Sequence, residues 1–158
     1  MSRSAEENII YEGRIRMPYT WAAGETSSYF LTQLRDHAKL WGTRCSACQM
    51  IFIPPRKNCP RCVTADTNWV ELPSRGVLQT YTVINFSEPL LQPSEPPYIY
   101  GIVKLDGADT GLTHFLGEVD PEKLRTGMRM EAVFKKKEER CGRITDLLYF
   151  RPEGGSGL

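Results

Sequence analysis

Four cysteines between residues 45 and 62 are the residues of this chain whose types and spacing could do chemistry. They form two Cys-x-x-Cys pairs separated by ten residues: Cys45, Cys48, Cys59 and Cys62. A Cys-x-x-Cys turn directs two sulfurs at one ion, and two such turns complete a tetrahedron of thiolates with no open coordination position. Because closed sites of this kind are structural and usually hold zinc, the sequence predicts a structural zinc site here.

The spacing alone leaves other uses of the four sulfurs open. Iron in the same geometry would make a rubredoxin-like electron carrier, and a ribbon without metal could be held by packing. A thioredoxin-like redox site needs one Cys-x-x-Cys beside a β-α-β pattern, which the sequence does not show. Residues 49–58 favour a short two-stranded ribbon with a turn at Pro54 and Pro55. Four nearby basic residues could offset the thiolate charge: Arg44, Arg56, Lys57 and Arg61.

Outside the cysteine pairs the sequence presents no catalytic arrangement, so we predict no catalytic residue. His37 falls in an expected helix and His114 in an expected strand, and neither accompanies a nucleophile motif. Cys141 is the fifth cysteine and falls in a polar hairpin. Glycine-rich nucleotide motifs, a nucleophile elbow and a metalloprotease motif are also missing from the sequence. These observations favour a binding or accessory subunit over an enzyme.

A helix is expected before the cysteines, over residues 26–42. Thr26, Ser27 or Ser28 could cap its first turn, and Gly42 stands where it would stop. Its apolar stripe could pack on the chain's own core or on another subunit, and comprises Phe30, Leu34, Ala38 and Trp41. The preceding residues, 1–25, are expected to form an extended arm that lies on its own domain or on a partner, because they include Tyr11, Tyr19 and Trp21.

After the cysteines the period of the apolar residues changes from helical to strand-like. Strands are expected over residues 76–86, 98–106, 112–119, 128–137 and 143–150, with a short helix over 120–128 that Asp120 caps. Five strands with one helix between the third and fourth is the element order of an OB-fold barrel. The segment 135–140 is expected to be a solvated hairpin tip, and the proline-rich loop 87–97, with Leu90 and Leu91, could contact another subunit.

The predicted fold class is therefore mainly β, with an N-terminal helix, a rubredoxin-like zinc ribbon and a five-stranded OB-fold barrel. The expected domains are an arm and amphipathic helix over residues 1–42, the ribbon over 43–68, the OB-fold over 69–152 and a tail over 153–158.

Composition and charge argue against several classes of protein. A net charge of +1 gives no electrostatic basis for binding nucleic acid. No apolar run approaches the roughly 18 residues that a membrane span needs. The N-terminal residues carry acidic side chains and no apolar core of a secretory signal. We therefore expect a cytoplasmic protein, in which the thiols stay reduced and paired cysteines favour metal over disulfides.

Several longer segments resemble one known family. They are residues 18–45, the segment IPPRKNCPRC at 53–62, the passage from WVEL to GVLQTYTV, the segment DPEKLRTGMRMEAVF at 120–134 and the closing FRP at 150–152. These are similar to the zinc-ribbon and OB-fold acyl-CoA-associated proteins, catalogued as domain of unknown function number thirty-five. The resemblance covers nearly the whole chain and includes all four cysteines of the family's metal site.

The resemblance implies a non-catalytic zinc subunit in a hetero-oligomer with a thiolase-like catalytic subunit. That partner would supply the nucleophile and the acid–base residues for cleaving or forming a 3-oxoacyl-CoA. Within the family, the similarity is greatest to members that assist the thiolysis of benzoylsuccinyl-CoA in anaerobic toluene degradation. No ligand-binding residue follows from it.

Two other functions remain open from the residues themselves. Zinc ribbons and OB-folds both serve nucleic-acid binding, for which the barrel offers aromatic residues that could stack on bases: Tyr81, Phe86, Tyr98 and Tyr100. The chain could also bind acyl-CoA by itself, without a catalytic partner.

Overall fold

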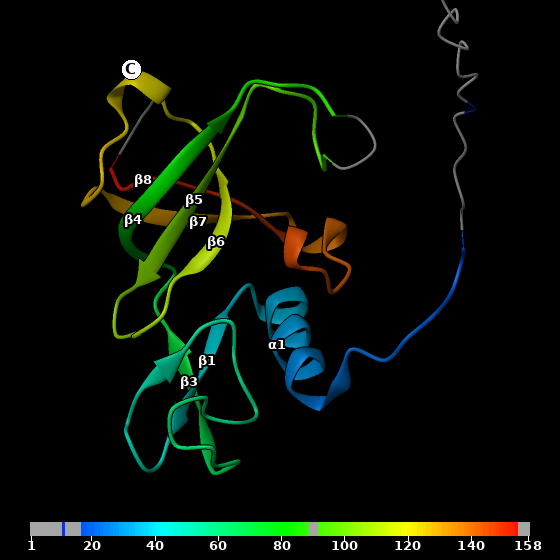
Figure 1. Cartoon of the computed structure of the whole chain (residues 1–158), viewed down its shortest axis with the longest axis vertical. Coiled ribbons are helices and arrows are strands. Elements are labelled where there is room, and N and C mark those ends of the chain that lie inside the picture. Colours follow the sequence, from blue (N-terminus) through cyan, green and yellow to red (C-terminus); the bar gives the residue numbers. More distant parts are fainter. Residues whose placement is uncertain (1–10, 12–16, 89–91, 155–158) are drawn as a thin grey trace, which may run out of the picture.

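The described residues fold into one α-helix, a small three-stranded sheet and a closed five-stranded barrel (Figure 1). The computed structural model describes residue 11 and residues 17–88 and 92–154. This architecture confirms the predicted fold class of helix, ribbon and OB-fold barrel. Among the described residues, no helix is long and apolar enough to cross a membrane.

Helix α1 spans Gly24–His37 and packs on the chain's own core. Phe30 and Leu34 are both buried, so the apolar stripe serves the chain itself. The predicted caps are wrong, because the N-cap is Ala23 and makes no side-chain hydrogen bond. The predicted end at Gly42 is also wrong. Ala38 has a left-handed backbone with φ of 53°, and its N–H bonds the carbonyl of Leu34, which terminates the helix.

The residues after α1 form a strand because their backbone groups pair with two other strands. Strand β1 (Leu40–Cys45) lies between β2 (Ile51–Phe52) and β3 (Thr67–Leu72), and both pairings are antiparallel. Gly42 permits this sheet, since a Cβ there would lie 2.7 Å from the carbonyl oxygen of Phe52.

The ribbon therefore has three strands, where the sequence analysis expected two. The third strand contains the WVEL segment, which the sequence analysis placed at the entry to the barrel. Residues on both sides of the expected segment 43–68 thus take part in the ribbon's sheet, and the domain boundaries stay a prediction.

The barrel consists of β4 (Arg75–Ile84), β5 (Tyr98–Leu105), β6 (Leu112–Leu116), β7 (Arg129–Phe134) and β8 (Leu147–Pro152). Its strand order is β4-β5-β6-β8-β7, and β7 closes it on β4. Strand β5 alternates between buried and half-buried residues, as expected for a strand with one face on the core. All five predicted strands are present, with shifted ends.

Two predicted details of the barrel need correction. The helix expected over 120–128 is only a 3₁₀ turn at Pro121–Lys123, although Asp120 does cap it by accepting a hydrogen bond from the Glu122 N–H. The residues after Lys123 return to extended backbone and reach β7 through Gly127, whose φ is +89°. The last strand begins at Leu147, because residues Ile144–Asp146 form another 3₁₀ turn.

One hydrophobic core joins the helix, the ribbon sheet and the barrel. Leu34 of α1, Leu40 of β1 and Ile53 after β2 belong to the same buried cluster as Leu78 and Leu147 of the barrel. The ribbon is therefore packed against the barrel and is not a separate body joined by a linker.

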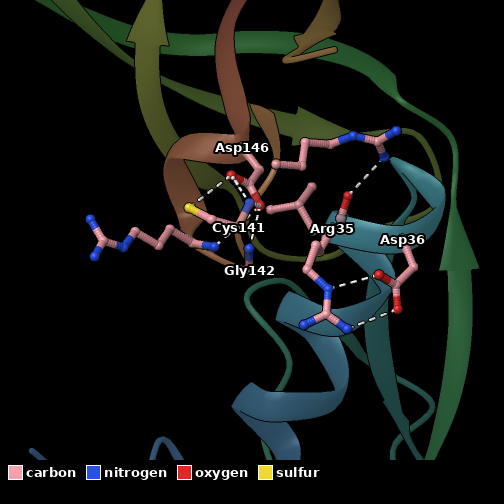
Figure 2. A network of polar contacts seen from close by, with 8 residues as sticks. Arg35, Asp36, Cys141, Gly142 and Asp146 are labelled. Carbon is pink, nitrogen blue, oxygen red and sulfur yellow. Dashed lines mark hydrogen bonds and ion pairs between the residues drawn. The ribbon is translucent and has the colours of Figure 1, made fainter. Parts of the chain in front are cut away.

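The connection between β7 and β8 is built around a buried carboxylate (Figure 2). Asp146 accepts hydrogen bonds from the backbone N–H groups of Cys141, Gly142 and Arg143, at distances of 2.7–3.2 Å. Burial raises its pKa, but these N–H donors outweigh burial and the net pKa lies below its usual value.

The same connection also contacts α1. Arg140 donates a hydrogen bond of 3.3 Å to the carbonyl of Leu34 in the last turn of α1, where a cation is favourable. Lys137–Glu139, within the predicted solvated tip, form an exposed 3₁₀ turn, so only the end of that segment is tied to the helix.

Replacing Asp146 by Asn should destabilise the fold by about 1–3 kcal/mol at pH 7, because an amide cannot accept all of these N–H bonds. The carboxylate stabilises the folded state at pH values above its unfolded pKa of about 3.9, and this contribution is lost as the pH falls through the lower folded pKa. Denaturant unfolding of both proteins should thus show a difference that shrinks below about pH 4. A difference that does not change with pH would contradict this role. Glu139→Gln, in the same connection, is the control.

Candidate metal centre

The four cysteine sulfurs converge on one site in the ribbon. All four sulfur atoms lie within 4.8 Å of one another, and those of Cys48 and Cys59 are 3.7 Å apart. Four sulfurs placed about 2.3 Å from a central zinc ion would be about 3.8 Å from each other. All four are free thiols, so no disulfide competes with a metal. The donor set therefore fits a tetrahedral ion such as zinc.

The two Cys-x-x-Cys turns have the same backbone hydrogen bonds. In the first, the N–H of Cys45 bonds the carbonyl of Met50, and the N–H of Gln49 bonds the carbonyl of Cys45. In the second, Cys59 and Thr64 repeat the first bond, and Val63 and Cys59 repeat the second. The two turns thus present their sulfurs from opposite sides in equivalent conformations.

Each turn contains one residue in a left-handed conformation directly after its second cysteine. Gln49 has a φ of 61° and Val63 a φ of 54°. This conformation is costly for a side chain other than glycine and most costly for a β-branched one such as Val63. These left-handed residues could not be predicted from the sequence, because neither position holds Gly or Asn.

Burial differs among the sulfur ligands. Cys45 and Cys59 are buried in a small cluster with Phe52, whereas Cys62 lies at the surface. Burial opposes ionisation of Cys59, but the backbone N–H groups of Cys62 and Arg61 and the neighbouring thiols lower its pKa to about 7. The pKa of Cys62 is raised by its interactions with Cys48, by burial and by the other thiols. The pKa values of Cys59 and Cys62 are thus shifted in opposite directions.

Two of the basic residues near the site, Arg56 and Lys57, contact other side chains. Arg56 lies over the ring of Phe52, 5.9 Å from its centroid, and Lys57 forms an exposed ion pair of 3.4 Å with Glu25. A backbone donor faces the Cys59 sulfur, because the N–H of Cys62 bonds it at 3.4 Å.

A turn of the barrel holds the free edge of β2. The carboxylate of Asp109 accepts the N–H of Ile51 at 2.7 Å, and the N–H of Asp109 bonds the carbonyl of Ile51 at 2.8 Å. The hydroxyl of Thr110 accepts the N–H of Ile53 at 2.8 Å and donates to the carbonyl of the same residue at 2.9 Å. These bonds satisfy a buried edge next to the cysteine turns and so couple the ribbon to the barrel.

The sequence did not predict this clasp, which is the set of hydrogen bonds that Asp109 and Thr110 make with Ile51 and Ile53. Asp109 and Thr110 fall in an ordinary polar turn, DGADTG, between β5 and β6, and nothing in its composition indicates a contact with residues more than fifty positions earlier.

The two histidines and Cys141 lie on different elements of the fold and have different hydrogen-bond partners. His114 is buried in β6, its Nδ1 accepts the N–H of Phe115, and its Nε2 lies 3.2 Å from the carbonyl of Ile144. Burial lowers its pKa, so the neutral ring donates through Nε2. His37 is exposed at the end of α1. The thiol of Cys141 is directed at Asp146, at 3.7 Å. The structure does not bring these three side chains together.

The outer face of β5 and β6 carries a cluster of aromatic rings. Tyr100 stacks on Phe115 with centroids 4.6 Å apart, and Tyr98 contacts both rings edge-on. Beside them is an open hollow of about 340 Å³ that includes Thr82, Tyr100 and Ile102. Of the four aromatics predicted to be available for stacking, Tyr81 is directed inward, where its hydroxyl bonds the carbonyl of Leu124. Leu90 and Leu91 lie outside the described residues.

The ribbon with its four cysteines and the OB-fold barrel define the class of this protein. Residues 69–135 match the family model described as "ChsH2, C-terminal OB-fold domain".

Two curated relatives are similar to the chain over part of its length. One is a "DUF35 domain-containing scaffold protein" of Methanocaldococcus jannaschii, 28% identical over 67% of this chain and 74% of that protein. The other is a "Probable enoyl-CoA hydratase alpha subunit" of Thermomonospora curvata, 33% identical over 54% of this chain and 26% of that protein.

A solved structure is similar to nearly the whole described fold. A chain of the "Ltp2-ChsH2(DUF35) aldolase" superposes with a TM-score of 0.62 and 27% identity, over 84% of this chain and 98% of that chain.

Removing the clasp should loosen the ribbon and leave the barrel intact. Asp109→Ala and Thr110→Val each leave a buried backbone group unpaired, so each should cost about 1–3 kcal/mol of unfolding free energy. Hydrogen exchange of the Ile51 and Ile53 amides should increase more than that of amides in β5. Thr113→Val, at an exposed position of β6, should change stability by no more than about 0.5 kcal/mol. Unchanged exchange at Ile51 and Ile53 would show that the clasp does not hold β2.

Proposed function

We propose that this chain is a non-catalytic accessory subunit of a thiolase-superfamily enzyme that acts on acyl-CoA. The observation that carries the proposal is the match to 98% of a chain of the "Ltp2-ChsH2(DUF35) aldolase", which includes both the ribbon and the barrel. The name of that protein joins two components, and the archaeal relative is named a scaffold protein. The second relative is named a probable enoyl-CoA hydratase subunit, which supports the proposal that the complex acts on acyl-CoA.

The side chains of this chain support a role without catalysis. A nucleophile needs a base within hydrogen-bonding distance, and that base needs an orienting group. His114 has both ring nitrogens engaged by the backbone, and the thiol of Cys141 faces a carboxylate of lowered pKa, which is a weak base. The reactive groups would therefore come from the larger subunit.

The metal in this proposal is structural zinc, held by the four cysteines. Zinc would fix the two turns that flank β2, which has only two residues, and thereby complete the surface that the partner meets. The proposal places the protein in the cytoplasm, where the thiols remain available to a metal.

The substrate of the complex is proposed to be a 3-oxoacyl-CoA, and benzoylsuccinyl-CoA is the specific candidate. This chain would then be the small subunit of a benzoylsuccinyl-CoA thiolase. The acyl group would be recognised mainly by the catalytic subunit, and we assign no residue of this chain to CoA.

Zinc removal should unfold the ribbon. The purified chain should be colourless and carry one zinc per copy by elemental analysis. Cys48→Ser should lose the metal and lower the Tm by about 10 °C or more, because structural zinc contributes folding free energy directly. Cys141→Ser is the matched control and should keep both the zinc and the Tm. A red protein with visible absorption would indicate iron, and a fully stable Cys48→Ser would make the site dispensable.

Gentle purification of a tagged copy from its own host should yield a stable complex with a thiolase-superfamily chain. Native mass spectrometry would give its composition, and thiolysis assays with acyl-CoA esters would follow on the purified complex. A lone zinc-bearing monomer would contradict the proposal. Calorimetry with CoA esters and salt-dependent binding of single-stranded oligonucleotides would then test the stand-alone acyl-CoA binder and the nucleic-acid module.

A further inference from the structure

Three large apolar side chains are exposed to solvent on the segment that precedes α1. Met17, Tyr19 and Trp21 are 74%, 77% and 74% exposed. Large apolar side chains that gather at the surface usually mark an interaction site. The core cluster described above does not include these three residues.

The three residues recur at every second position, which places them on one side of an extended segment. Residues 17–23 contain neither helix nor strand and run away from the body of the protein (Figure 1). Pro18 favours an extended backbone both at its own position and at Met17. In an extended chain, side chains two residues apart point to the same side at a spacing of about 7 Å. Pro18, Thr20 and Ala22 would occupy the opposite side.

The composition of the segment defines the surface that it fits. Residues 17–22, MPYTWA, carry no charge, so a complementary groove is apolar and uncharged. A buried tyrosine hydroxyl and a buried indole N–H each require a hydrogen-bond partner, so the groove also provides acceptors at the ends of two pockets. Tyrosine and tryptophan are the side chains that most often dominate the free energy of such interfaces.

We propose that residues 17–22 are a linear docking segment that binds in an extended conformation to an apolar groove on the catalytic partner. Met17, Tyr19 and Trp21 enter successive pockets of that groove. This inference rests on the proposed function, since the occupant is the larger subunit of the complex. Helix α1 anchors the segment, because Trp21 lies three residues before Gly24 and Phe30 fixes the helix on the core.

Because side chains alternate between the two sides of the segment, residues on the opposite side provide a matched control. The first variant is Met17→Ser/Tyr19→Ser/Trp21→Ser, and the matched variant on the opposite side is Thr20→Ser/Ala22→Ser. Both should keep the zinc content and Tm of the parent chain, because these residues lie outside the core. The affinity of each full-length chain for the purified catalytic subunit is measured by calorimetry. The first variant should bind at least about 100-fold more weakly, and the second within about threefold of the parent.

Other results would overturn the inference and identify the error. If the parent chain binds no acyl-CoA enzyme, the proposed function fails first. If the parent binds and the first variant binds equally well, the docking segment is wrong and the proposed function stands. Equal losses in both variants would reject the one-sided arrangement. Dimerisation of the isolated chain that the first variant abolishes would assign the segment to a second copy, and Trp21 fluorescence shielded from acrylamide in the isolated chain would assign it to its own surface.

Discussion

The convergence of four sulfurs within 4.8 Å is the constraint on which the ribbon depends. The turns that carry them hold Gln49 and Val63 in left-handed conformations that these side chains do not favour. Between the two turns lies β2, a strand of two residues with only two register pairs to β1. So short a strand cannot hold its place by pairing alone. It is fixed by the cysteine turns on one side and by Asp109 and Thr110 of the barrel on the other.

This arrangement packs the ribbon and the barrel together around one hydrophobic core. The core passes from Leu34 through Leu40 and Ile53 into the barrel without a break. The clasp at Asp109 and Thr110 adds directional bonds to that contact, and Arg140 ties the β7–β8 connection to the end of α1. A rigid body of this kind suits a subunit whose task is to present a fixed surface, because little conformational entropy is lost when a partner binds. The segment before α1 is the described part that stands apart from this body (Figure 1).

The electrostatics of the cysteine cluster follow from the same geometry. Backbone N–H groups help to lower the pKa of Cys59, whereas the contact with Cys48 raises the pKa of Cys62. A divalent cation allows all four sulfurs to ionise. Asp146 shows the same principle without a metal, because three N–H groups keep a buried carboxylate charged.

The sequence by itself determined the features that rest on local patterns. The spacing of Cys45, Cys48, Cys59 and Cys62 predicted a shared site, and strand-like periodicity predicted the five strands of the barrel. Only the tertiary structure decided where α1 ends, because β1 forms through pairing with β3, a segment more than twenty residues later. It also decided the third strand of the ribbon, the inward direction of Tyr81 and the clasp on β2. These features depend on contacts between residues distant in the chain, and a local pattern of residue types does not indicate which distant residues come into contact.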